Sequence, residues 1–303
     1  MSGKQGGNTT SSQSRVERAR RIDAHHHLWR FNEAEFSWID DSMAMLRRDF
    51  LMDDLERDLA VAKMDGTVAV QARESVEETR WLLECAGSSD TIWGVVGWAP
   101  VASDELPQIL DSFGEDAKLV GFREVVQGKT DGYLEQAGFD RGIEELGRRG
   151  FAYDILIHER QLAEASRFVD RHPNQRFVLD HAAKPKIAAK ELEPWRTNLR
   201  ELARRGNVGC KISGLVTEDD WRSWNLESLR PYLDACVEAF GPQRLLAGSD
   251  WPVCLVASNY TRWWAVLGEY FLGFSEDEKG AIFGENASEF YGLRVGVADE
   301  SRG

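Results

Sequence analysis

The sequence contains few cysteines. Only four occur among its 303 residues, and no two are separated by just two positions: Cys85, Cys210, Cys236 and Cys254. This spacing excludes a zinc knuckle and a thioredoxin-like Cys-x-x-Cys motif. Sparse, unpatterned cysteines in a chain of this length are typical of a protein from a reducing compartment.

Long apolar runs are also missing. No stretch approaches the roughly eighteen apolar residues of a membrane span, and the first residues lack the apolar core of a secretory signal. The net charge is −14, and an acidic chain repels phosphate backbones and anionic membranes. The acidic residues are spread along the chain, as expected for solubility. We therefore expect a cytoplasmic protein with neither nucleic acid nor a membrane as partner; the oligomeric state is not predicted.

The chain divides into a polar tail and one long patterned region. Residues 1–20 are rich in Gly, Ser, Thr, Asn and Gln and then in Arg, so they cannot bury enough apolar surface to offset the entropy lost on ordering. We predict a disordered tail there, with a basic partner-binding arm as the less favoured alternative. A second short tail is predicted at 294–303.

Between the tails, short apolar runs alternate with amphipathic stretches. The runs predict strands at 22–27, 66–71, 92–98, 119–123, 152–158, 176–180, 208–212 and 245–247. The stretches predict helices at 79–86, 139–149, 159–171, 195–205, 228–240 and 275–283. This count predicts an α/β fold, a single-domain TIM-type (β/α)8 barrel over residues 21–293.

An open, doubly wound sheet would show the same alternation and is the alternative fold. No Gly-x-Gly-x-x-Gly follows the first strand, which disfavours the nucleotide-binding form of that alternative. The long connection at 29–65 carries aromatic and acidic residues and is predicted to cover one end of the barrel.

Three of the six histidines lie within the first predicted strand. Because side chains alternate along a strand, Asp23, His25 and His27 are expected on one face, with Ala24 and His26 on the other. Two imidazoles spaced in this way converge on one point. They can hold a metal ion or polarise a carbonyl oxygen.

Polar residues also follow the other predicted strands, at the end where the sites of TIM barrels lie. In order along the chain they are Gln71 and Arg73, Trp98, Arg123 and Glu124, His158, Asp180 and His181, Lys211 and Ser213, and Ser249, Asp250 and Trp251. His25, His27, His181 and Asp250 would be costly to bury without a function.

The other candidates have structural alternatives. His158 is more often a polar cap than a ligand, and Gln71 can serve a strand end. Trp29, Trp98 and Trp251 are more often packing residues than platforms for a substrate, since an indole buries a large area. Asp23 can act as a buried acceptor that orients a histidine.

The order of five motifs resembles the amidohydrolase superfamily, in particular its amidohydrolase-2 branch of sugar-lactone and dicarboxylate-lactone hydrolases. The motifs are Asp23-x-His25-x-His27, Gly121-Phe122-Arg123, Leu179-Asp180-His181-x-x-Lys184-Pro185, Lys211-x-Ser213-Gly214-Leu215 and Gly248-Ser249-Asp250-Trp251-Pro252. Residues 285–291 resemble the family's last helix, and residues 38–50 resemble the L-fuconolactonase group most. The likeness covers residues 21–293.

The resemblance implies a carboxylic ester hydrolase that opens an aldonolactone such as L-fuconolactone. Asp250 is expected to activate the water and then to protonate the ring oxygen. His25, His27 and His181 are expected to polarise the carbonyl group, directly or through a metal ion. The expected substrate-binding residues are Arg123, Gln71, Trp29, Trp98 and Trp251.

The resemblance leaves the metal open. Amidohydrolases with two metal ions carry a carboxylated lysine or glutamate on the fourth strand, whereas this strand ends in Arg123 and Glu124. We expect one divalent metal ion, zinc before others, held by His25, His27, His181 and Asp250, or a reaction without metal. Glu124 and His158 are less favoured ligands.

Two other functions stay open at this point. One is a dicarboxylate lactone hydrolase or a metal-dependent non-oxidative decarboxylase of the same fold. It would require more cationic groups in the pocket, of which Arg123, Lys184 and Arg73 are candidates. The other is a non-catalytic barrel that binds a sugar.

Overall fold

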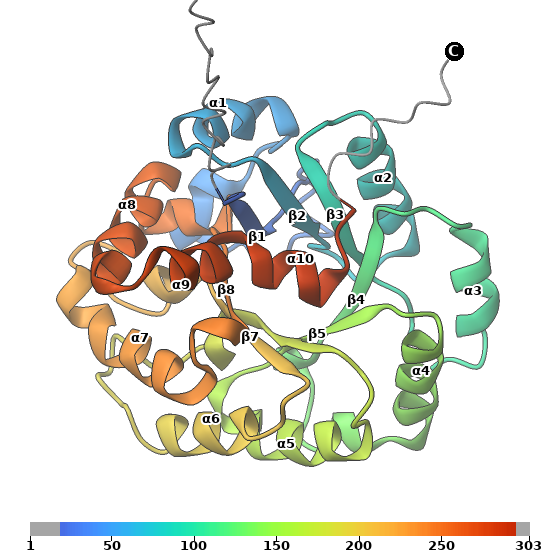
Figure 1. Ribbon diagram of the computed structural model, residues 1–303. Coiled ribbons are helices and arrows are strands. Elements are labelled where there is room, and N and C mark those ends of the chain that lie inside the picture. The colour runs from blue at the N-terminus through green and yellow to red at the C-terminus, as the bar shows by residue number, and fades with distance from the viewer. Residues whose placement is uncertain (1–18, 295–303) are drawn as a thin grey trace, which may run out of the picture.

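The computed structural model describes residues 19–294, so the predicted tails lie outside it, apart from Ala19, Arg20 and Arg294. Eight parallel strands form one sheet in chain order (Figure 1). They are β1 (Ile22–His26), β2 (Gly66–Val70), β3 (Ile92–Gly97), β4 (Leu119–Val125), β5 (Ala152–Leu156), β6 (Phe177–Leu179), β7 (Val208–Ile212) and β8 (Leu245–Ala247).

The segment that follows β8 is hydrogen-bonded to β1 and the residue after it. The Asp250 amide donates to the His25 carbonyl over 2.8 Å, and the His27 amide donates to the Trp251 carbonyl over 2.6 Å. These bonds bring β1 and the segment after β8 together and close the ring. The predicted (β/α)8 barrel is confirmed, and the open sheet is excluded.

Helices surround the strands (Figure 1). They are α1 (Met52–Ala62), α2 (Val76–Gly87), α3 (Leu106–Ser112), α4 (Ala137–Arg148), α5 (Leu162–Arg171), α6 (Trp195–Ala203), α7 (Leu226–Phe240), α8 (Tyr260–Tyr270), α9 (Glu276–Gly280) and α10 (Asn286–Tyr291). The six predicted helices all occur, with ends shifted by a few residues. The pattern did not identify α1, α3 or α8. In α1 only Leu55 and Leu59 are buried, which is a weak periodic signal.

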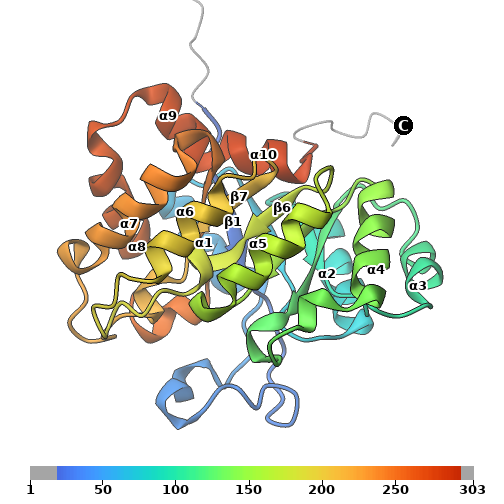
Figure 2. The ribbon, with the colours of Figure 1, turned by 90° about the horizontal axis from the view of Figure 1, so that it is seen from below.

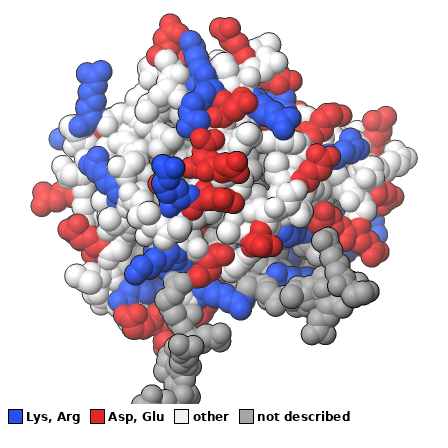
Figure 3. Space-filling view, turned by 90° about the horizontal axis from the view of Figure 1, so that it is seen from above, with Lys and Arg blue, Asp and Glu red and all other residues white. Residues whose placement is uncertain are grey.

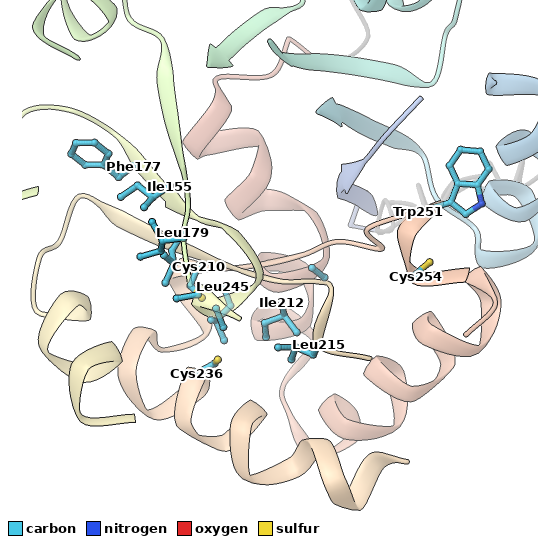
Figure 4. Close-up of a cluster of buried hydrophobic side chains, with 14 of the residues drawn as sticks. Ile155, Phe177, Leu179, Cys210, Ile212, Leu215, Cys236, Leu245, Trp251 and Cys254 are labelled. Carbon is cyan, nitrogen blue, oxygen red and sulfur yellow. The ribbon is translucent and has the colours of Figure 1, made fainter. Parts of the chain in front are cut away.

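Two apolar layers hold the barrel together. The outer layer lies between strands and helices, and Figure 4 shows part of it: Leu179 and Cys210 on their strands face Cys236 of α7. The inner layer fills the barrel with small and branched residues such as Val68, Val96 and Val178. Because side chains alternate along each strand, neighbouring residues serve different layers.

The two ends of the barrel are covered differently. Helix α10 lies across the amino-terminal end (Figure 1), and its Tyr291 belongs to the inner layer. The connection at 29–50, which contains a short 3-10 helix over Asp41–Leu46, projects on the opposite side from α10 (Figure 2). That segment supplies walls of the cavity described below. Of the connection predicted at 29–65 to cover one end, the part before residue 51 lies at that end, whereas Met52–Ala62 form α1.

The described surface matches the composition. Lys and Arg are interspersed with Asp and Glu over the face seen in Figure 3, as the even spread of charge along the sequence predicts. None of the helices between residues 19 and 294 is long and apolar enough to cross a membrane.

Candidate active site

Four side chains from three strand ends meet at the carboxyl end of the barrel. His25 Nε2 and His27 Nε2 lie 3.2 Å apart. Asp250 Oδ1 lies 3.4 Å from His27 Nε2, 3.7 Å from His25 Nε2 and 3.8 Å from His181 Nε2. All four side chains are buried. They are the four that the sequence singled out, and the fold brings them together.

Unusual backbone positions aim two of these groups. Residues 181–184 follow β6 with positive φ angles, starting with 51° at His181, and Asp250 has φ 58° after β8. Each such position in a non-glycine residue costs on the order of 1–2 kcal/mol. Strain of this kind persists where the surroundings enforce it, and it clusters at functional sites.

Each of the three imidazoles is held in place by a contact at its Nδ1 atom. His27 Nδ1 donates to the Val70 carbonyl over 2.8 Å, and His181 Nδ1 lies 2.8 Å from Ser213 Oγ. His25 Nδ1 lies 3.0 Å from Lys211 Nζ. The Nε2 atoms of His25 and His27 are thereby left to face each other, and that of His181 faces Asp250.

Burial and neighbouring charges set the protonation states. Burial lowers the pKa of His181 to about 4 and holds the pKa of His25 well below its ordinary value, where the Lys211 charge adds to the effect. Burial alone would raise the pKa of Asp250, but His181, a hydrogen bond from His27 and the Lys184 charge together lower it. At neutral pH the site therefore pairs the neutral imidazoles of His25 and His181 with the ionised carboxylate of Asp250.

A cavity of about 640 Å³ opens above these groups. His27, His181, Asp250 and Arg123 line it. The connection at 29–50 and the loops after the strands add the rest of the wall: Glu35, Trp38, Met43, Ala72, Arg73, Glu74, Ser75, Val125, Gln127, Leu156, Lys184, Thr217, Glu218 and Val253. This is the size of a small-molecule site.

The site can be compared with known proteins. A model of the amidohydrolase family matches residues 22–293. The chain belongs to this family. An L-fucono-1,5-lactonase from Burkholderia multivorans is 40% identical over 289 residues, which are 91% of this chain and 97% of the relative. An L-fucono-1,5-lactonase from Burkholderia ambifaria is 36% identical over 278 residues, 89% of this chain and 95% of the relative.

The fold of this amidohydrolase is matched by solved structures. One is an amidohydrolase from Burkholderia multivorans with bound zinc. It is 40% identical, superposes with a TM-score of 0.88, and the match covers 91% of this chain and all of the other.

Several predicted binding residues support the cavity without lining it. Gln71 is buried, and its side chain and carbonyl group accept hydrogen bonds from Arg123. Trp29 is buried and donates from Nε1 to the Arg48 carbonyl over 2.9 Å. Trp251 is buried beside the Phe50 ring, 5.3 Å away in a T-shaped contact.

The other predicted site residues, Trp98, Glu124 and His158, lie apart from the three histidines and Asp250. Trp98 does not line the cavity. Glu124 is 3.7 Å from Lys129, and burial together with the Glu74 carboxylate raises its pKa to about 7. His158 is half-buried at the start of a 3-10 turn.

Asp23 does not share the face of β1 on which His25 and His27 lie, contrary to the prediction. It accepts hydrogen bonds from Ser249, from the hydroxyl of Tyr260 on α8 and from the His25 amide. The pairing of β1 with β2 shifts register between Asp23 and His26, and a bulge of this kind reverses the alternation of faces. Asp23 thus ties β1 to the end of β8 and orients the backbone of His25.

The sequence analysis placed Arg123, Asp180 and Lys211 at strand ends, but it did not identify Asp154 or the network of buried charges that the four form below the histidines. Lys211 Nζ lies 2.6 Å from Asp154 Oδ2 and 3.0 Å from Asp180 Oδ1, and Arg123 Nη1 donates to Asp180 Oδ2 over 2.9 Å. These four side chains are buried. Asp154 lies within β5, not at its end. An acidic residue at an inward-facing position of a predicted strand is the sequence signal that could have identified it.

The donor set of this amidohydrolase fits a divalent metal ion. Bonds of about 2.0–2.1 Å to a tetrahedral ion place its ligand atoms roughly 3.4 Å apart, and the spacings here are 3.2–3.8 Å. His25, His181 and Asp250 each offer an atom within 4.8 Å of the others. The site therefore has the geometry of one metal position.

Proposed function

We propose that this amidohydrolase hydrolyses a sugar lactone, an aldonolactone such as L-fuconolactone, to the aldonic acid. The observation that carries the proposal is the group of three imidazoles around the Asp250 carboxylate at a small-molecule cavity, where burial favours the neutral form of His25 and His181. Lactone hydrolysis needs a base for the water, donors for the carbonyl oxygen and a proton for the ring oxygen. The two fuconolactonases described above support this reaction.

In the proposed reaction, Asp250 is the general base. Its pKa lies below the ordinary value, so the carboxylate is free to take a proton at neutral pH. Water adds to the lactone carbonyl carbon while Asp250 takes one water proton. The carbon–ring-oxygen bond then breaks, and Asp250 returns the proton to the ring oxygen. The products are the ring-opened hydroxyl group and a carboxylic acid, which ionises.

The imidazoles stabilise the oxyanion formed during the addition. His27 and His181 line the cavity beside Asp250, and His25 Nε2 lies against His27. Burial keeps His25 and His181 neutral, so they act as fixed dipoles and need no reorganisation as charge develops. Removing a single oxyanion donor from an enzyme costs about 10²–10³ in turnover.

The charge of the cavity wall favours a neutral sugar over a dicarboxylate. Arg73 already pairs with Glu35 and Glu78. Arg123 is committed to Asp180 and to Gln71. Lys184 lies 3.9 Å from Glu218. Two carboxylates would need two free guanidinium forks, whereas the carboxylates and amides of the wall suit hydroxyl groups.

A divalent metal, zinc before others, fits the same position. When bound, such an ion supplies Lewis-acid polarisation of the carbonyl group and acidifies water. His25, His181 and Asp250, with His27 beside them, are the residues that would hold it. The base role of Asp250 and the alignment of the imidazoles belong to the protein with or without the ion.

A panel of lactones tests the function. Aldonolactones, with L-fuconolactone first and D-arabinonolactone and L-galactonolactone as neighbours, are compared with dicarboxylate lactones by acid release, with and without chelator. We expect the highest kcat/KM for an aldonolactone. A dicarboxylate lactone hydrolysed at least roughly tenfold better would contradict the sugar but not the Asp250 chemistry. Binding of aldonolactones without any acid release would favour the non-catalytic barrel. A cytoplasmic location without nucleic-acid partners stays a prediction.

A further inference from the structure

Trp38 is an exposed indole in the wall of the active-site cavity. Its exposed fraction is 42%, and the other large apolar side chains exposed within residues 19–294 are Met45, Val61 and Leu272. Of these four side chains, only that of Trp38 lines the cavity. An indole left in water keeps a large apolar area hydrated, which is unfavourable. A ligand that covers the ring inside the cavity removes that cost.

A tight turn presents this indole outward. The Ile39 amide donates to the Phe36 carbonyl over 2.9 Å, and Phe36 and Ile39, the two ends of the turn, are buried. The Arg47 guanidinium donates twice to the Ile39 carbonyl, over 3.2 and 3.1 Å. Because both ends are anchored, the residues exposed are the two in the middle of the turn, Ser37 and Trp38. The fold thus determines where the indole stands.

The ring of Trp38 packs against Trp29, which in turn lies beside the histidines. The two indoles form a T-shaped contact with their centroids 6.0 Å apart and their planes at 90°. Trp29 is buried and is held by the bond from its Nε1 to the Arg48 carbonyl. Its ring centroid lies 6.5 Å from that of His27. Since Trp38 and His27 line one cavity and are separated by a single indole, a ligand of the size of a sugar lactone can contact both.

The wall near Trp38 is less polar than the wall formed by the loop after β2. The connection at 29–50 and the segment after β8 add Met43 and Val253, whereas the loop after β2 adds Arg73, Glu74 and Ser75. An aldonolactone ring is divided in the same way, with C–H groups on its faces and hydroxyl groups around its rim. The face of an indole carries negative charge density that attracts C–H groups, and carboxylates and hydroxyls bind hydroxyl groups.

We infer that Trp38 is a specificity-determining residue, on which the C–H face of the lactone ring stacks. The open-chain acid has no such face, so the indole favours binding of the substrate over binding of the product. Because the turn holds Trp38 in place before any ligand arrives, little order has to be imposed on binding. That the ring belongs to a sugar lactone rests on the proposed function, whereas the exposure and anchoring of the indole do not.

Binding of an unreactive analogue tests this role without hydrolysis. The analogue is the 1,5-lactam corresponding to L-fuconolactone, in which N–H replaces the ring oxygen, and its affinity is measured by calorimetry. We expect Trp38→Ala to weaken binding by about tenfold or more and Trp38→Phe, which keeps an aromatic face, to stay within about threefold of the wild type. Met45→Ala is the matched control, because Met45 is exposed on the same connection but lies outside the cavity wall. Its affinity should equal that of the wild type.

Two further readouts separate stacking from a general effect on the fold. The indole fluorescence of the wild type should change when the lactam binds, and most of that change should be missing in Trp38→Phe although the lactam still binds. With L-fuconolactone, Trp38→Ala should raise KM and leave kcat within a few-fold, since the indole contacts the ring and not the group that reacts.

The possible outcomes are distinct. Equal lactam affinity in Trp38→Ala and the wild type overturns the inference, and so does an equal loss in Met45→Ala or a wild type that binds no lactam. A changed oligomeric state of Trp38→Ala at unchanged affinity assigns the indole to a contact between copies of the chain and overturns it as well. Lactam binding that depends on Trp38, without hydrolysis of any lactone, contradicts the proposed function alone.

Discussion

Gly214 lies directly against His181. A Cβ atom at position 214 would come within 2.8 Å of His181 Nδ1 and within 3.0 Å of Asp250 Oδ2, and the backbone there has φ 65°. The close approach allows the segment after β7 to place Ser213 on His181. Glycine is thus required at this position both by its backbone angle and by the space that the two site residues occupy.

We expect Gly214→Ala to lower kcat by about ten-fold or more, since a misplacement of the order of 1 Å can cost a hundred-fold. Gly241→Ala is the matched control. Gly241 has φ 66°, but an added Cβ meets nothing within 4 Å. Because ψ is 165° at Gly241 and 0° at Gly214, Gly132→Ala is added as a second control: Gly132 has φ 87° and ψ 3° and an added Cβ there meets nothing within 4 Å. Comparing kcat and the thermal midpoint of Gly214→Ala with those of Gly132→Ala separates the steric effect from the cost of the left-handed backbone. Equal activity in the two variants would show that the contact with His181 is unimportant.

Asp250→Asn tests the proposed base. The change keeps the shape of the side chain but removes the group that takes the proton, so kcat should fall by about 10²–10⁴. Glu218→Gln is the control, because Glu218 also lines the cavity but bonds with none of the histidines. We expect it to retain turnover within a few-fold. If Asp250→Asn kept most of its initial rate with L-fuconolactone, another group would have to be the base.

Asp23 should make stability depend on pH. Burial raises its pKa from 3.8 to about 6, so the folded state binds the proton more tightly than the unfolded state. The resulting stabilisation is complete below the unfolded pKa and is lost as the pH rises through about 6. The shift corresponds to about 3 kcal/mol at most. The free energy of unfolding of the wild type, relative to Asp23→Asn, should therefore fall between about pH 4 and about pH 7.

The comparison is made by urea unfolding at several pH values. Asp104→Asn serves as control, since Asp104 is exposed and ion-paired with Arg141 on the surface. The same series on this variant shows how much pH dependence an exposed, ion-paired aspartate produces. A difference for Asp23→Asn that does not change with pH would contradict the raised pKa.

The sequence predicted the parts of this molecule that local rules determine. Alternating apolar runs, with polar residues at their ends, were enough to predict the barrel and to place His25, His27, His181 and Asp250 at one end of it. A parallel barrel brings all carboxyl ends of its strands to one side, so residues far apart in the sequence converge without further information.

What could not be predicted depends on irregular backbone and on pairing across the barrel. The bulge that turns Asp23 away from the cavity leaves no pattern in the sequence. The cavity wall comes largely from loops, including Trp38 of the long connection, whereas the predicted indoles Trp29 and Trp251 pack behind it. The contact between Lys211 and His25 joins residues 186 positions apart, and only the closed barrel determines that these two side chains meet.

The last prediction concerns metal binding. A ligand that binds only the folded state stabilises it, by about 2.7 kcal/mol at one hundred times its dissociation constant. For a chain of this size that corresponds to a rise of roughly 4–5 °C in the thermal midpoint. We expect Zn²⁺ to raise the midpoint of the wild type, chelator to reverse the effect, and His25→Asn and His181→Asn to abolish it. His158→Asn is the control, because His158 lies outside the cluster and should leave the response to Zn²⁺ unchanged. A rise in the His181→Asn protein as large as in the wild type would place the ion elsewhere in the molecule.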